Sequence, residues 1–67
     1  MFMKLKIKEV RKKRKLTQIE LAKLTGISKS SISRYEREEI WPDMLEMEWI
    51  ALALDVKITD LFDSEVK

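Results

Sequence analysis

The chain has 67 residues, which is enough for one small domain, and it contains no cysteine and no histidine. Disulfides and cysteine-based metal sites are excluded, and most enzyme classes lose their usual general base, so we expect no catalysis, no metal and no cofactor. With one Gly and one Pro among 45% hydrophobic and 39% charged residues, the composition favours helices joined by short connections.

The net charge of +2 conceals a strong asymmetry along the chain. Residues 1–37 hold 12 Lys/Arg and 3 Asp/Glu, whereas residues 38–67 hold 2 and 9, which gives +9 and −7. Such a split indicates a face that meets a polyanion, with nucleic acid as the first candidate and an anionic membrane surface as the second. No apolar run approaches the ~20 residues that span a bilayer, and no signal peptide is visible. We therefore expect a cytoplasmic, nucleoid-associated protein.

The periodicity predicts a single all-α domain over residues 1–67. The five expected helices cover about residues 4–14, 18–24, 29–37, 43–54 and 58–63. Ile7 and Val10 point inward on the first helix, and Lys15 follows it at a position where glycine is preferred. Residues 63–67 are expected to be a frayed end.

The second and third predicted helices have clear start signals. Thr17 and Glu20 form a capping box, and the single glycine, Gly26, suits a left-handed turn just after the second helix. Leu21 and Leu24 are expected to face the core.

Ser28 is the expected cap of the third helix, with Ile32 and Tyr35 pointing inward. Its opposite face is short, polar and basic, with Lys29, Ser30, Ser33, Arg34 and Arg37.

The fourth predicted helix carries two apolar stripes, which is more than the roughly 100° arc that faces one core. Core packing accounts for the stripe made by Met44, Met47, Ile50, Ala51 and Leu54. The other stripe consists of Trp41, Leu45, Trp49 and Leu52. It has three interpretations: packing under the C-terminal end with Val66 folded back, scattered surface residues, or a dimer face. The two tryptophans favour the dimer face, because aromatic residues are enriched in interface cores.

Two helices joined by a short glycine-containing turn, from Gln18 to Arg37, have the helix-turn-helix signature. In that geometry the second helix enters the major groove with its N-terminal residues at base edges. Here those residues are Ser28, Lys29 and Ser30, whose side chains can donate to base edges.

The same residues belong to a longer pattern that resembles the Cro/C1-type (lambda repressor-like, XRE) helix-turn-helix family from about Lys6 to Phe62. The matching residues are Ile7, Val10, Arg11, Leu16, Thr17, Gln18, Leu21, Ala22, Gly26, Ile27, Ser28, Ile32, Ser33, Arg34, Tyr35, Glu36, Pro42, Ile50, Ala51, Leu54, Val56, Leu61 and Phe62. The resemblance implies a compact five-helix domain that binds a near-palindromic DNA operator, usually as a two-fold homodimer, and regulates transcription.

The resemblance also implies roles for individual residues. Base edges would be contacted by Ser28, Lys29, Ser30 and Arg34. The DNA backbone would be contacted by Thr17, Gln18, Arg11 and Arg37. Arg11 and Glu36 match a buried or half-buried ion pair between the first and third helices, so Arg11 is expected to be partly structural.

The sequence departs from the family pattern at three places. Lys15 replaces a common glycine after the first helix. The residues 38–41, Glu-Glu-Ile-Trp, replace a loop that usually has glycine and basic or polar residues and approaches the phosphate backbone. Trp49 and Leu52 are apolar where the family is more often polar.

Two functions from different classes follow. The first is a sequence-specific DNA-binding repressor that acts as a homodimer. The alternative is a protein-interaction or antitoxin-type module that binds a protein partner through the surface from Trp41 to Leu52 and has weak DNA specificity.

Overall fold

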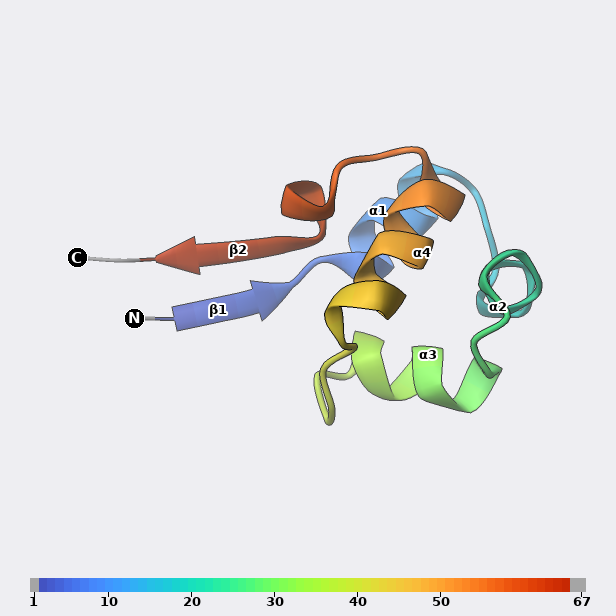
Figure 1. The fold of residues 1–67 in the computed structure, drawn as a ribbon, viewed down its shortest axis with the longest axis horizontal. Coiled ribbons are helices and arrows are strands. Elements are labelled where there is room, and N and C mark those ends of the chain that lie inside the picture. The colour runs from blue at the N-terminus through green and yellow to red at the C-terminus, as the bar shows by residue number, and fades with distance from the viewer. Residues whose placement is uncertain (1, 66–67) are drawn as a thin grey trace.

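The computed structural model describes residues 2–65, with side chains described for residues 4–63. In this part of the chain, four α-helices and one 3₁₀ turn pack together, and a two-stranded antiparallel sheet projects from them (Figure 1). The elements are β1 (Phe2–Leu5), α1 (Ile7–Lys13), α2 (Gln18–Thr25), α3 (Lys29–Glu36), α4 (Met44–Leu54), η1 (Ile58–Leu61) and β2 (Phe62–Glu65).

The two strands correct the expectation of five helices and an all-α fold. Lys4 and Leu5 belong to β1 and not to the first helix, Phe62 belongs to β2 and not to the last helix, and residues 63–65 continue β2 where a frayed end was expected. The register pairs Leu5 with Phe62, and the Lys6 amide donates to the Leu61 carbonyl at 2.7 Å. β1 is thus held by its pairing with β2, a contact between the two ends of the chain that local periodicity does not show. The last predicted helix is only a 3₁₀ turn. Val66 lies outside the described residues.

The core draws one or more residues from every helix and from η1. Its fully buried large side chains are Ile7, Leu21, Ile32, Ile50, Leu54 and Leu61. Leu5 of β1 is also buried, and Phe62 of β2 packs against the cluster, which anchors a two-stranded ribbon that would be marginal alone.

Two expected core residues are instead on the surface. Leu24 is 61% exposed, because α2 places Leu21 in the core and turns Leu24 toward the outer side of α4. Met44 is 70% exposed in the first turn of α4, where Met47 takes the core position.

The longest helix, α4, has 11 residues. No helix within residues 2–65 is both long and apolar enough to cross a bilayer.

Candidate nucleic-acid interface

The turn between α2 and α3 is fixed by local hydrogen bonds. Gly26 has φ 76°, the left-handed conformation that glycine adopts without a steric cost, and its amide donates to the Ala22 carbonyl at 2.8 Å. The Thr25 hydroxyl donates to the Leu21 carbonyl at 2.8 Å and accepts from the Ile27 amide at 3.2 Å. Ile27 is buried in the core. The turn therefore holds α2 and α3 at a defined angle.

Both helices also have strong N-caps. The Thr17 hydroxyl accepts from the Glu20 amide at 3.1 Å, and the Glu20 carboxylate accepts from the Thr17 amide at 2.8 Å, as the capping box predicts. These hydrogen bonds with Thr17 lower the pKa of Glu20. At α3, the Ser28 hydroxyl accepts from the Ser31 amide at 3.2 Å. The Ser28 side chain, an expected base contact, is thus already used as a cap.

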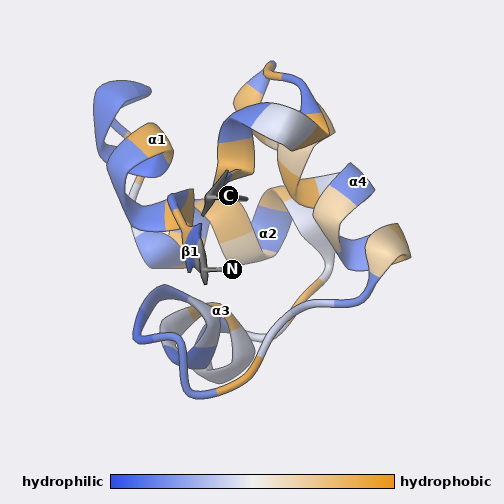
Figure 2. Cartoon of the chain, turned by 90° about the vertical axis from the view of Figure 1, so that its left-hand side faces the viewer, coloured by the Kyte–Doolittle hydropathy of each residue, from blue (hydrophilic) through white to orange (hydrophobic). Residues whose placement is uncertain are grey.

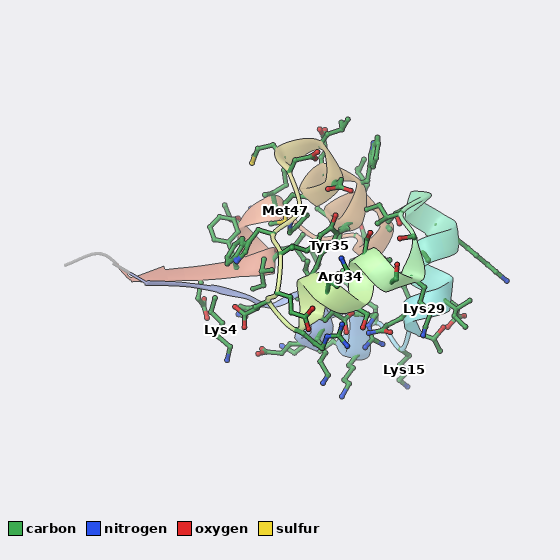
Figure 3. All side chains as sticks on the ribbon, turned by 90° about the horizontal axis from the view of Figure 1, so that it is seen from below. Lys4, Lys15, Lys29, Arg34, Tyr35 and Met47 are labelled. Atoms are coloured by element: carbon green, nitrogen blue, oxygen red, sulfur yellow. The ribbon has the colours of Figure 1, made fainter. Side chains whose placement is uncertain are left out.

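The exposed face of α3 collects the other expected base-contact residues. Lys29, Ser30 and Arg34 are exposed, whereas Ile32 and Tyr35 turn into the core. In Figure 3, which views the molecule from the α3 side, Lys29 and Arg34 lie toward opposite ends of this helix. α3 therefore presents a polar and basic surface across its whole length.

A buried charged network connects the first three helices. The Arg11 guanidinium donates to Glu36 through Nε at 2.6 Å and Nη2 at 3.0 Å, and through Nη1 to the Leu16 carbonyl at 2.7 Å. Gln18 Nε2 donates to the same carboxylate at 3.0 Å. Arg11 is only 8% exposed, yet its hydrogen bonds with Glu36 raise its pKa, so it stays charged. The ion pair implied by the resemblance is thus present in the structure.

This network limits what Arg11 and Gln18 can offer to a phosphate. The Arg11 guanidinium uses three of its five N–H groups inside the protein, and these bonds help to hold α1, α2 and α3 together. Gln18 has two N–H groups, and the bond to Glu36 uses one of them. The Thr17 hydroxyl accepts in its cap and keeps its own hydrogen for donation.

The loop after α3 engages both of its carboxylates, Glu38 and Glu39, in contacts within the protein. Glu38 accepts from the Leu5 amide at 3.0 Å, and Glu39 pairs with Arg37 at 2.8 Å. Glu38 has φ 59°, the left-handed conformation, where the family usually has glycine. The contact between Glu38 and β1 could not be predicted from the sequence, because the strand itself was not predicted.

Tyr35 joins α3 to α4 on the inner side. Its hydroxyl donates to Glu46 at 2.8 Å, and Glu46 also completes the capping box of α4 with Asp43. Burial and the Glu46 carboxylate raise the pKa of Tyr35 to about 12. Sequence reasoning placed Tyr35 in the core but did not find its partner.

The second apolar stripe of α4 faces solvent in this chain. Its members are Trp41, Leu45, Trp49 and Leu52, and Leu52 is 72% exposed. Leu24 of α2 joins this surface, and Leu24, Thr25, Trp49, Leu52 and Ala53 line a hollow of ≈ 290 Å³. In Figure 2, hydrophilic colours predominate in α1, whereas apolar colours are more frequent in α4. The chain thus has two different exposed surfaces, one basic and one apolar.

Comparison with known proteins agrees with this geometry. A family model described as helix-turn-helix matches residues 7–61, which include all four α-helices. The chain is also 35% identical, over 60 residues, to the immunity repressor protein of Bacillus phage phi105. This match covers 90% of the chain but only 42% of the relative's length. The family match, together with the fixed turn between α2 and α3, shows that the chain belongs to the Cro/C1-type helix-turn-helix family.

Proposed function

We propose that the chain is a sequence-specific DNA-binding repressor of transcription that docks α3 in the major groove. The observation that carries this proposal is the exposed face of α3, where Lys29, Ser30 and Arg34 stand on a helix fixed by its cap and turn. The helix-turn-helix family match and the related phage immunity repressor support the same function.

The chemistry of this face suits base readout. Arg34 can donate to guanine O6 and N7 with two parallel hydrogen bonds, and Lys29 can donate to the same atoms. Ser30 can donate to or accept from either base of a pair. On the flanks, the Thr17 hydroxyl, the second N–H of Gln18 and Arg37 are the groups that can reach phosphates.

The apolar stripe supports action as a two-fold homodimer. Trp41, Leu45, Trp49 and Leu52 are exposed together on and just before α4, and large apolar groups of this kind mark interfaces when they gather. A dimer through this surface binds a near-palindromic site with half-sites about one helical turn apart, roughly 34–36 Å.

Selection from a random duplex DNA pool at about 0.15 M salt tests the proposal. We expect a near-palindrome to be enriched. Lys29→Ala and Arg34→Ala should each weaken binding to that site by roughly 1–3 kcal/mol and relax the preference at one position. Lys57→Ala, which removes one exposed charge on the segment before η1, serves as the matched control. Unchanged sequence preference in both α3 variants would rule out this reading face.

The exposed stripe on α4 favours a second candidate, a protein-interaction or antitoxin-type module. In that case a protein partner covers Trp49 and Leu52, and DNA binding has no preferred sequence. A purified chain that is dimeric without a partner and selects one DNA site would eliminate this module as the main function.

A further inference from the structure

A flank of α1 that the helix-turn-helix face does not include carries a row of basic side chains. Lys8 and Lys12 are one helical turn apart, and Lys15 follows where the chain leaves α1 toward α2. All three side chains are exposed. We refer to Lys8, Lys12 and Lys15 as the α1 strip.

The helix geometry places Lys8 toward the α3 side of α1 and Lys12 at the edge of that side. Arg11 points to Glu36 of α3, and at 100° per residue Lys8 and Lys12 stand about 60° and 100° around the helix from Arg11. Lys13 stands about 160° away from Arg11. It lines a different hollow, with Glu9 and with Asp60 of η1. The two flanks of α1 therefore face different parts of the molecule.

Figure 3 supports this placement for Lys15, which it labels. In this view from the α3 side, Lys15 lies at the edge of the face that also carries Lys29 and Arg34. Lys15 is also two residues before Thr17, which begins the α2 cap. The strip thus continues the basic surface of α3 onto the neighbouring helix.

The carboxylates around this surface are engaged within the protein, including Glu9, which is paired with Lys4, and Glu20, which accepts from the Thr17 amide. Glu36 is paired with Arg11, Glu39 with Arg37, and Glu38 with the Leu5 amide. In residues 4–63, where side chains are described, Lys8, Lys12 and Lys15 take part in none of the ion pairs. Like charges at i and i+4 repel each other on an isolated helix, so Lys8 and Lys12 gain from an external anion.

We propose that the α1 strip binds backbone phosphates of the DNA duplex beside the segment that α3 reads. The ammonium group of lysine is a compact point charge that neutralises phosphate without reading bases. The strip therefore adds affinity that does not depend on sequence, and α3 adds the sequence preference. This inference rests on the proposed function, because it requires that the chain binds duplex DNA.

The test compares two charge-matched double variants of the full chain. Lys8→Gln with Lys12→Gln removes two charges from the strip, and Lys13→Gln with Lys57→Gln removes two exposed charges away from it. Binding to the selected site and to a random-sequence duplex is measured by fluorescence anisotropy over a series of KCl concentrations. Circular dichroism and urea unfolding check that both variants fold like the parent chain.

We expect the strip variant to lower the slope of log K against log salt by about 2, or about 1 for each lysine. The loss should be the same on both duplexes, so the ratio of specific to random binding stays constant. The control variant should keep the slope of the parent chain. Lys15→Gln, which keeps an L-residue at φ 59°, should lower the slope by about 1 more.

Equal slopes for the strip variant and the control variant would overturn the inference while leaving the proposed function intact. A parent chain that binds neither duplex would overturn both. Vesicles of phosphatidylcholine and phosphatidylserine serve as the other polyanion. If the strip variant loses vesicle binding and keeps its DNA slope, the strip is a membrane-binding surface and the inference is wrong.

Discussion

The α1–α3 half and the α4–η1 half of this small protein are held together by different forces. In the first half, apolar contacts are supplemented by the buried network of Arg11, Gln18 and Glu36. In the second half, Ile50, Leu54 and Leu61 are fully buried, and the Tyr35 hydroxyl of α3 donates to Glu46 of α4. The exposed surfaces of the two halves differ as well. The first half exposes polar and basic side chains on α3, and the second half exposes the apolar side chains of Trp49 and Leu52.

The difference shows how a short chain keeps a polar working face in place. α3 has 8 residues and uses its outer side for polar and charged groups, so it has little apolar area with which to hold its position. The charged network and the helix caps hold α3 in position instead. α4 has more large apolar side chains than the core buries, and Trp49 and Leu52 are exposed. Four experiments test this difference between the two halves.

The largest effect is expected from breaking the buried pair in the first half. Glu36→Ala leaves Arg11 buried without its partner, which should reduce the free energy of unfolding by about 3–5 kcal/mol. Urea unfolding followed by circular dichroism measures this loss. Glu9→Ala, on the exposed side of α1, is the control and should change stability by less than about 0.5 kcal/mol. Equal stabilities for the two variants would mean that the network does not hold the first half together.

The link between the halves should depend on pH. Tyr35 has its pKa raised from 10.0 to about 12 in the folded chain, so the unfolded chain loses this proton first as the pH rises. Below about pH 10, Tyr35 therefore contributes about 2–3 kcal/mol to the free energy of unfolding. This contribution is lost as the pH rises from about 10 to about 12. Unfolding of the parent chain and of Tyr35→Phe should be compared over this range, because the two chains differ only in the Tyr35 hydroxyl. Parallel pH profiles for the two proteins would contradict the prediction.

The apolar surface of the second half should control association. Trp49→Ala and Leu52→Gln should each weaken the dimer by about 2 kcal/mol if these side chains lie at its centre. Sedimentation equilibrium measures the dissociation constant. Ile19→Gln, which changes another exposed apolar residue on α2, is the control and should leave association unchanged. A parent chain that is monomeric at high concentration would remove the dimer from the proposed function.

The smallest effect concerns two left-handed residues. Lys15 and Glu38 both have φ 59°. Lys15→Gly should relieve backbone strain and stabilise the chain by about 0.5–1 kcal/mol. Glu38→Gly should give no such gain, because it also removes the acceptor of the Leu5 amide. Thermal unfolding of both variants measures the difference, and an equal gain in both would mean that the Glu38 hydrogen bond contributes nothing.

The local signals of the sequence were enough to predict α2, the turn and α3. The capping box at Thr17, the glycine at residue 26 and the cap at Ser28 act within a few residues, so they can be read without tertiary contacts. The predicted ranges 18–24 and 29–37 differ from the observed helices by one residue each. The basic outer face of α3 follows from the same periodicity.

Features that depend on distant partners were missed. β1 exists because β2 pairs with it from the other end of the chain, so Lys4 and Leu5 looked like the start of a helix. Leu24 matched a core position by spacing, but its exposure depends on where α4 packs. The hydrogen bond from the Leu5 amide to Glu38 joins residues 33 apart, so no local pattern in the sequence indicates it.

The pairing of β1 with β2 determines how the molecule responds to a pulling force. Both ends of the described chain emerge at the tip of one antiparallel ribbon, on the side away from α2 (Figure 1). A load that separates the two ends acts on the ladder from Phe2 and Glu65 inward, so its hydrogen bonds are loaded one after another and not together. The ribbon should therefore unzip at low force, as far as the bond from Lys6 to Leu61, while the helices remain folded. A tether attached at the two ends would then extend in two steps, and the helix-turn-helix face would survive the first.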